Sequence, residues 1–240
     1  MSSTRRTASI VGVLFLVQTL AFIIAEQLIS AVLKRPDYLT GISGDANSLT
    51  IGAIFAFISG VAVVAIAILM FPLLRPTSEP LALGYVGERV VELVVQVLFY
   101  VSAPLLLIAI GSGLRDGSVT ASAAQTMGPA LKAVHDVGIV VLYLVTSVGG
   151  TVFAFLLYRS RLVPRPLAVV GLIGYPVLLV GCVLAMFGAT DLTQGAGLLA
   201  VVPGGLFELI LPILLIVKGF RQPVTTAISS GSIAVALSPA

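Results

Sequence analysis

The sequence is poor in the residues that hold soluble domains, metal sites and redox centres together. Charged residues make up 10% of the 240 positions, tryptophan is absent, and cysteine and histidine occur once each. A soluble domain carries about a quarter charged residues. The single cysteine, Cys182, lies inside an apolar run, which excludes a disulfide framework and a paired thiolate metal site. With His135 as the only histidine, paired-histidine haem ligation across a bundle is also excluded.

Long apolar runs make up most of the chain instead. Hydrophobic residues make up 58% of it, and the mean hydropathy is +1.16. Apolar runs recur with short polar breaks, and each is about as long as the roughly 20 residues that a helix needs to cross a bilayer. The runs are continuous and lack the alternation of a membrane barrel. The sequence therefore predicts an all-α polytopic membrane protein, a bundle of six transmembrane helices.

The six predicted spans occupy residues 8–33, 49–74, 81–110, 137–158, 166–187 and 198–217. The breaks between them contain Pro, Gly and charged residues, which end helices. The longest connection is 111–136, in which 121–135 is predicted to form a short interfacial helix. Residues 1–220 form the membrane domain, and 221–240, rich in Ser, Thr, Ala and Pro, form a flexible tail.

The basic residues between these spans predict the orientation. One side of the membrane collects eight of them, namely Arg5, Arg6, Arg75, Arg159, Arg161, Arg165, Lys218 and Arg221. The other side has four, namely Lys34, Arg35, Arg115 and Lys132. The richer side is expected in the cytoplasm, which places both termini there and the protein in the plasma membrane. Their scatter at helix ends, rather than in a patch, argues against a nucleic-acid partner.

The third span carries a polar stripe. At 100° per residue, Tyr85, Glu88, Arg89, Glu92, Gln96 and Tyr100 fall within about a third of the helix circumference, and aliphatic residues fill the remainder. A polar stripe of this length faces other helices or a water-filled cavity, because exposure to lipid is costly.

A second intramembrane acid, Glu208, lies near the middle of the sixth span. Gly204 and Gly205 fall on the same face, which favours close approach of another helix. Arg89 and Glu208 lie at a similar depth, roughly 15 Å from the cytoplasmic side at 1.5 Å per residue. We therefore predict a buried ion pair between them, which makes the third and sixth spans neighbours.

The candidate intramembrane polar cluster is thus Glu88, Arg89, Glu92, Gln96 and Glu208. Two interpretations stay open: a site for ions, protons or an anionic substrate, and a structural clasp that fixes helix register. The cluster has three acids and one base. A structural pair needs one acid, so the surplus favours a functional site.

Other polar residues carry weaker signals. A metal site combining His135 with Glu26 or Asp45 lacks any ligand spacing, so no metal is predicted. Glu26 is expected to reach the lipid headgroups, and Gln18 to make an interhelical hydrogen bond. Catalytic and phosphate-binding motifs are absent from the sequence, so we expect no catalytic residues, no cofactor and no enzyme activity.

Small residues at four-residue spacing, such as Ala56 with Gly60, allow helices to approach closely. The pattern serves contacts within one chain and in a homo-oligomer equally well. Membrane lipids are the one expected partner, and the ligand, if any, is not specified by the sequence.

With these residues in view, the chain resembles a bacterial family of six-span membrane proteins known as domain of unknown function 4386. The resemblance covers about residues 5–220 and rests on a basic residue before the first span and on motif residues in the third and sixth. These are Gly87, Arg89, Glu92, Glu208, Pro212 and Lys218-Gly219-Phe220. One departure is Leu214, where the family has tryptophan. The resemblance implies no known activity, cofactor or substrate.

We therefore expect a non-enzymatic binding, regulatory or structural membrane component. The alternative is a small-solute or proton-coupled transporter that uses the polar cluster. Transport predicts an aqueous cavity that reaches Glu88 or Glu92, and a structural role predicts a dry, tightly filled cluster.

Overall fold

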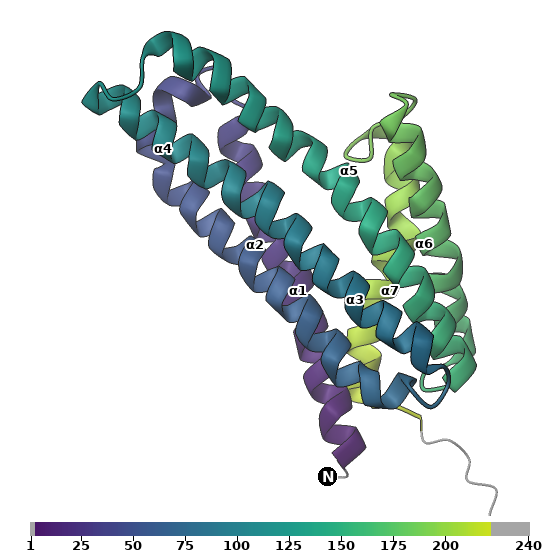
Figure 1. Ribbon diagram of the computed structural model, residues 1–240. Helices are drawn as coiled ribbons and strands as arrows, with labels where there is room; N and C mark the ends of the chain where they lie inside the picture. The colour runs from purple at the N-terminus through teal and green to yellow at the C-terminus, as the bar shows by residue number, and fades with distance from the viewer. Residues whose placement is uncertain (1–2, 222–240) are drawn as a thin grey trace, which may run out of the picture.

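A computed structural model describes residues 3–221, and these form long helices without strands (Figure 1). The helices are α1 (Ser3–Leu33), α2 (Tyr38–Leu74), α3 (Glu79–Gln96), α4 (Ala103–Asp116), α5 (Ala121–Ser160), α6 (Arg165–Met186) and α7 (Leu198–Val217). A π-helical stretch, η1 (Val97–Ser102), joins α3 to α4, and a 3-10 turn, η2 (Gly195–Gly197), precedes α7. The expected tail lies almost wholly outside the described residues.

Six stretches of the described chain are long and apolar enough to cross a membrane, which confirms the predicted six-span architecture. They are Thr4–Leu33, Gly44–Leu74, Glu79–Asp116, Ala121–Ser160, Arg165–Met186 and Gly195–Val217. The protein is therefore a multipass helical membrane protein.

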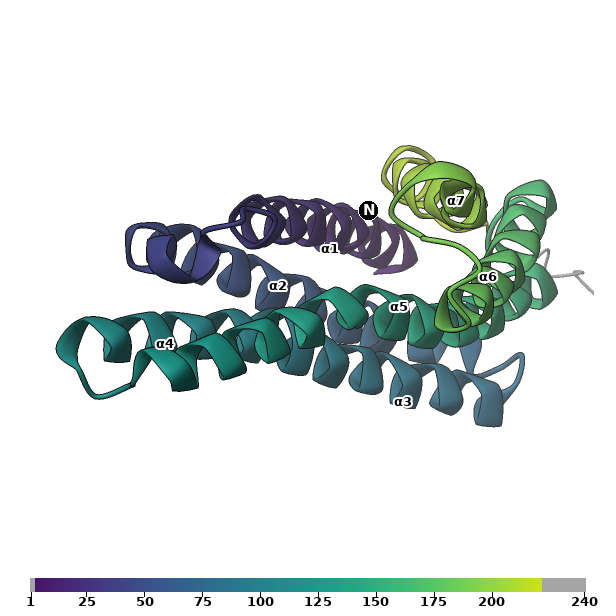
Figure 2. The same cartoon turned by 90° about the horizontal axis from the view of Figure 1, so that it is seen from above.

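The spans close into a ring. Its order is α1, α2, α3 with α4, α5, α6 and α7, and α7 packs back against α1. Figures 1 and 2 show α6 and α7 as a pair beside α5, while α2 and α4 lean away from them toward the end opposite the N-terminus. We call this opposite end the distal end. The ring matters for function because all six spans then face one central axis.

Two corrections concern the helix boundaries. Residues 121–135 are not a separate interfacial helix; they are the first part of α5, which has 40 residues. At about 1.5 Å per residue α5 is about 60 Å long, roughly twice the hydrocarbon thickness. Its first part rests on an extension of α2, since Leu39 occupies the space beside Gly128. The long connection expected at 111–136 therefore shrinks to the four residues between α4 and α5.

Local chemistry explains where these helices end. Gly117 ends α4 with a φ of 78°, a conformation that glycine adopts without strain. Thr120 caps α5 by accepting a hydrogen bond from the Ala123 amide at 3.3 Å. The third span is interrupted at η1, which precedes Pro104. A proline lacks the amide hydrogen that the α-helical bond requires, so its presence favours the local π geometry.

Two contacts hold α7 in the ring. Arg5 on α1 donates from Nη2 to the carbonyls of Ile216 at 2.8 Å and Val217 at 2.9 Å, and so caps the last turn of α7. On the other flank, a Cβ at Gly174 of α6 would lie 2.6 Å from the Gly204 amide nitrogen of α7. These two helices touch backbone to backbone, which only glycine permits.

Candidate functional site

The polar stripe of the third span faces the inside of the bundle, as predicted. Tyr85, Arg89, Glu92, Gln96 and Tyr100 are all buried. The aliphatic arc of the same helix is half exposed and includes Val90, Val91, Val94 and Leu98. The separation of polar and apolar residues onto two faces thus distinguishes the interior face of this helix from its lipid face.

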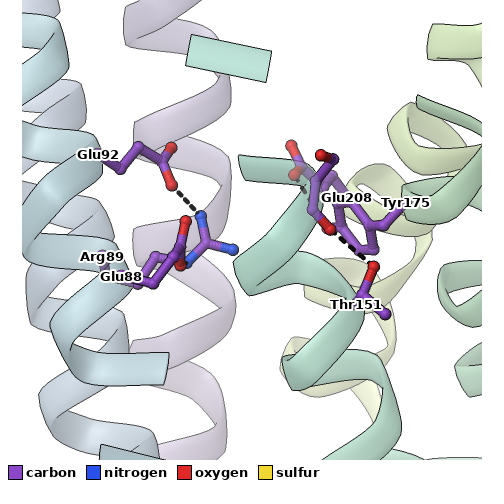
Figure 3. A network of polar contacts seen from close by, with 7 residues as sticks. Glu88, Arg89, Glu92, Thr151, Tyr175 and Glu208 are labelled. Atoms are coloured by element: carbon purple, nitrogen blue, oxygen red, sulfur yellow. Dashed lines mark hydrogen bonds and ion pairs between the residues drawn. The ribbon is translucent and has the colours of Figure 1, made fainter. Parts of the chain in front are cut away.

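Arg89 forms the centre of an ion cluster on α3 (Figure 3). Its Nη1 donates to Glu92 Oε2, and its Nε lies 3.3 Å from Glu88 Oε2. The guanidinium carbon also lies 5.1 Å from the ring centroid of Tyr85, a cation–π contact. Arg89 is only 3% exposed, so these partners replace the water that a buried guanidinium loses.

Glu88 is seated against α5 by a glycine. A Cβ at Gly149 would lie 1.6 Å from Glu88 Oε2, far inside van der Waals contact. The carboxylate of Glu88 therefore occupies space that any other residue at 149 would fill. This glycine brings α5 against the charged part of α3, and the single-helix pattern of the sequence did not single it out.

The predicted ion pair between Arg89 and Glu208 is wrong. Glu208 instead accepts a hydrogen bond from the Tyr175 hydroxyl at 3.0 Å, and both partners of Arg89 lie on its own helix. The reason is the ring order, in which α3 and α7 are not neighbours. The glycine face beside Glu208 admits α6 through Gly174 and Gly204. Figure 3 shows Arg89 and Glu92 on one side and Glu208 with Tyr175 on the other.

Glu92 and Glu208 nevertheless belong to one site, because both line a cavity of about 190 Å³ on the ring axis. We call this cavity the central chamber. Every span contributes a polar group to it: Gln18 and Thr19 from α1, Ser59 from α2, Glu92 and Gln96 from α3, Thr146 from α5, Tyr175 from α6 and Glu208 from α7. Gln18, expected to make an interhelical hydrogen bond, contributes to this lining instead.

The charge of the chamber lining has one sign. Glu92 and Glu208 are its two charged residues, and no Arg, Lys or His is among the described residues that line it. Arg89, which pairs with Glu92, is not among the lining residues. Thr19 Oγ1 and Gln96 Oε1 are buried and have no hydrogen-bond partner within the described chain. The chamber thus presents carboxylates and free acceptor oxygens, the groups that bind cations and hydrogen-bond donors.

An aromatic layer lies next to the chamber on the side of the N-terminus. Phe153 stacks on Tyr85 with ring centroids 4.7 Å apart and contacts Phe15 and Phe207, and Phe207 contacts Tyr175. These five rings come from α1, α3, α5, α6 and α7 and belong to the largest apolar core of the described chain. The layer separates the chamber from that end of the bundle.

The remaining sequence candidates lie elsewhere. Glu26 does not extend freely toward the lipid surface; its Oε2 lies 3.8 Å from His135 Nε2, and Ser30 donates to its Oε1 at 2.5 Å. Asp45 pairs with Arg35 and not with His135. In the part of the chain that the structure describes, no three His, Cys, Asp or Glu side chains gather as a metal site would require.

Two residues of the site were not predicted from the sequence: Tyr175, which donates a hydrogen bond to Glu208, and Gly149, which leaves space for the Glu88 carboxylate. Tyr175 had a detectable signal, since a tyrosine in an apolar span commonly turns its hydroxyl toward a buried partner. Gly149 belongs to a Gly-Gly pair in the fourth span, but nothing in that span indicates which helix approaches it.

Fold and site together define a multipass helical membrane protein with an acidic chamber at the centre of its ring. The model of the family described as Domain of unknown function (DUF4386) matches residues 10–219. The chain belongs to this family, as its resemblance predicted. Comparisons with curated proteins and with solved structures gave no match.

Proposed function

We propose that this protein binds a small cationic solute, of the class of primary ammonium ions, in the central chamber. The observation that carries the proposal is the lining of the chamber, which among the described residues holds two carboxylates and no basic side chain. Arg89 forms its ion pairs with Glu88 and Glu92, and Glu208 has no ion pair within the described chain, so a cation between Glu92 and Glu208 would provide Glu208 with a direct counter-charge.

The size and hydrogen-bonding groups of the chamber support a solute of this class. About 190 Å³ holds roughly six waters at about 30 Å³ each and is smaller than the roughly 300–1,000 Å³ of sites for drug-sized ligands. An ammonium group has three donors, which match a carboxylate of Glu208, Thr19 Oγ1 and Gln96 Oε1. An anion would meet two like charges in a poorly solvated site.

The proposal is for a binding component of the plasma membrane without enzyme activity or cofactor. Both termini are proposed to lie in the cytoplasm, which the distribution of basic residues supports. In that orientation the distal end of the bundle faces the outside.

Binding to the purified protein in lipid nanodiscs tests the proposal. Propylammonium should bind saturably and raise the thermal unfolding midpoint, because a ligand of the folded state stabilises it. Propionate, an anion of similar size, should do neither. Glu208→Gln should weaken propylammonium binding about tenfold or more, since it removes a buried counter-charge. Glu79→Gln is the matched control, because Glu79 is an exposed carboxylate on α3 that pairs with Arg75.

Absence of saturable binding, equal binding of propionate, or an unchanged affinity in Glu208→Gln would each contradict this function.

Transport of the same solute is the second candidate. It is favoured by a further cavity at the distal end, whose lining begins at Tyr100 on η1, about one helical turn from Gln96 in the lining of the central chamber. A transporter should move radiolabelled methylammonium into proteoliposomes at a rate that Glu208→Gln reduces. A binding component should hold the solute without net flux.

A further inference from the structure

The cavity at the distal end has a volume of about 630 Å³, and we call it the end chamber. It lies between α1, η1, α5 and the segment 190–194 that leads to α7. Glu26, Lys34, Tyr100, Lys132, His135 and Asp191 are among its lining residues. Neither the sequence motifs nor the proposed function of the central chamber uses this group of side chains.

Among its described lining residues, the end chamber has one more acidic side chain than it has lysines. Lys132 pairs with Asp136 on α5. Asp191 accepts hydrogen bonds from Thr193 and Gln194, which, with a smaller contribution from Lys34, hold its pKa below the usual value. The two lysines are thus balanced by two aspartates, and Glu26 remains without a lysine or arginine partner in the described chain, with His135 Nε2 3.8 Å from its Oε2.

Glu26 stands among buried polar groups that have no hydrogen-bond partner within the described chain. These are its own Oε2, the hydroxyl of Tyr100 and both ring nitrogens of His135. Tyr100 is fully buried and His135 is 3% exposed, and both line the chamber. Buried polar groups in native proteins nearly always have partners, so this concentration indicates a ligand or ordered water.

Aromatic faces complete the arrangement. The ring centroid of Tyr100 lies 5.0 Å from that of His135 and 5.2 Å from that of Phe22, both at an interplanar angle of 69°. A carboxylate beside aromatic rings suits an ammonium ion, which gains both an ion pair and a cation–π contact.

The same rings lie between the two chambers. Phe22 lines the central chamber and Tyr100 the end chamber, and they touch. Tyr100 belongs to η1, whose π geometry is often found at functional sites. The two chambers therefore meet at the contact between Phe22 and Tyr100.

We propose that the end chamber is a second site for a small ammonium ion, with Glu26 as its counter-charge and Tyr100 and His135 as its wall. This inference rests on the proposed function for the identity of the solute. The surplus charge and the unpartnered groups of the end chamber support it independently of Glu208.

The test uses a cysteine as a local reporter. In a Cys182→Ala background, Ile139→Cys places a thiol in the end chamber, and Ser122→Cys places one on the exposed first turn of α5 as a control. The labelling rates of a trimethylammonium and a sulfonate methanethiosulfonate are compared, each relative to its rate with a free thiol. The cation-to-anion ratio should be several-fold higher at 139 than at 122, because the surplus negative charge of the end chamber attracts one reagent and repels the other.

Glu26→Gln should abolish this preference, while the glutamine still accepts the bond from Ser30. Propylammonium should also slow labelling at 139, in the parent and in Glu208→Gln, but not in Glu26→Gln. A ratio that Glu26→Gln does not change, or protection that is lost with Glu208→Gln and kept with Glu26→Gln, would overturn the second site. Failure of the proposed function looks different, because propylammonium then gives no Glu208-dependent binding while the charge preference at 139 persists.

Discussion

The packing of the Glu88 carboxylate against Gly149 allows a direct test of the site geometry. A Cβ at 149 would lie 1.6 Å from Glu88 Oε2, so Gly149→Ala must displace the carboxylate from its place beside Arg89. Overfilling a packed interior costs about 1–3 kcal/mol, and the better helix propensity of alanine returns about 1 kcal/mol. We expect a net loss of up to about 2 kcal/mol in the free energy of unfolding.

The same substitution in a Glu88→Ala background identifies the cause of that loss. In a Glu88→Ala background the space beside residue 149 is free, so Gly149→Ala should then be neutral or stabilise by up to about 1 kcal/mol. The expected coupling free energy between the two sites is about 1–3 kcal/mol, within the range known for residues in contact. Gly84→Ala is the control, because a Cβ there meets nothing within 4 Å.

Reversible unfolding in mixed detergent and SDS micelles, followed by circular dichroism, measures all four members of the cycle. If Gly149→Ala costs the same with and without Glu88, the carboxylate does not occupy the space beside that glycine and the described site is incorrect.

Three further predictions concern the packing of α7 and the orientation of the chain. Gly174→Ala should lower the free energy of unfolding by about 1–3 kcal/mol, since a backbone cannot yield as a side chain does, and the same unfolding assay should show Gly84→Ala to be neutral or stabilising. Arg5→Ala should lower the free energy of unfolding by about 1–2 kcal/mol through loss of the cap on α7, and Arg6→Ala, next to it and exposed, should lower it little; equal effects would contradict the capping of α7 by Arg5. A periplasm-specific phosphatase fused after Arg221 should be silent, and an active fusion would reverse the proposed orientation.

The features predicted correctly from the sequence are those that a single helix encodes. Apolar length predicted six spans, and the period of 3.6 residues predicted that Arg89, Glu92 and Gln96 face inward. Both follow from local physics, because lipid excludes polar side chains whichever helices lie next to them.

The features that the sequence did not predict depend on which helices are neighbours. Depth along the membrane placed Arg89 level with Glu208, but depth does not determine order around a ring, and α6 took the place expected for α3. The π stretch before Pro104 and the continuous α5 were missed for a related reason. A proline in an apolar run is compatible with several local geometries. The predicted helix at 121–135 continues into the span as one helix, and its first part packs on the extension of α2, which the sequence of α5 alone does not indicate.

An experimental structure of the protein in nanodiscs with saturating propylammonium tests the central claim most directly. The account predicts density for one solute in the central chamber, with its nitrogen within ion-pair distance of Glu208 or Glu92, and loss of that density in Glu208→Gln. A chamber that is filled by side chains, or that holds no solute under conditions that saturate binding, would contradict it.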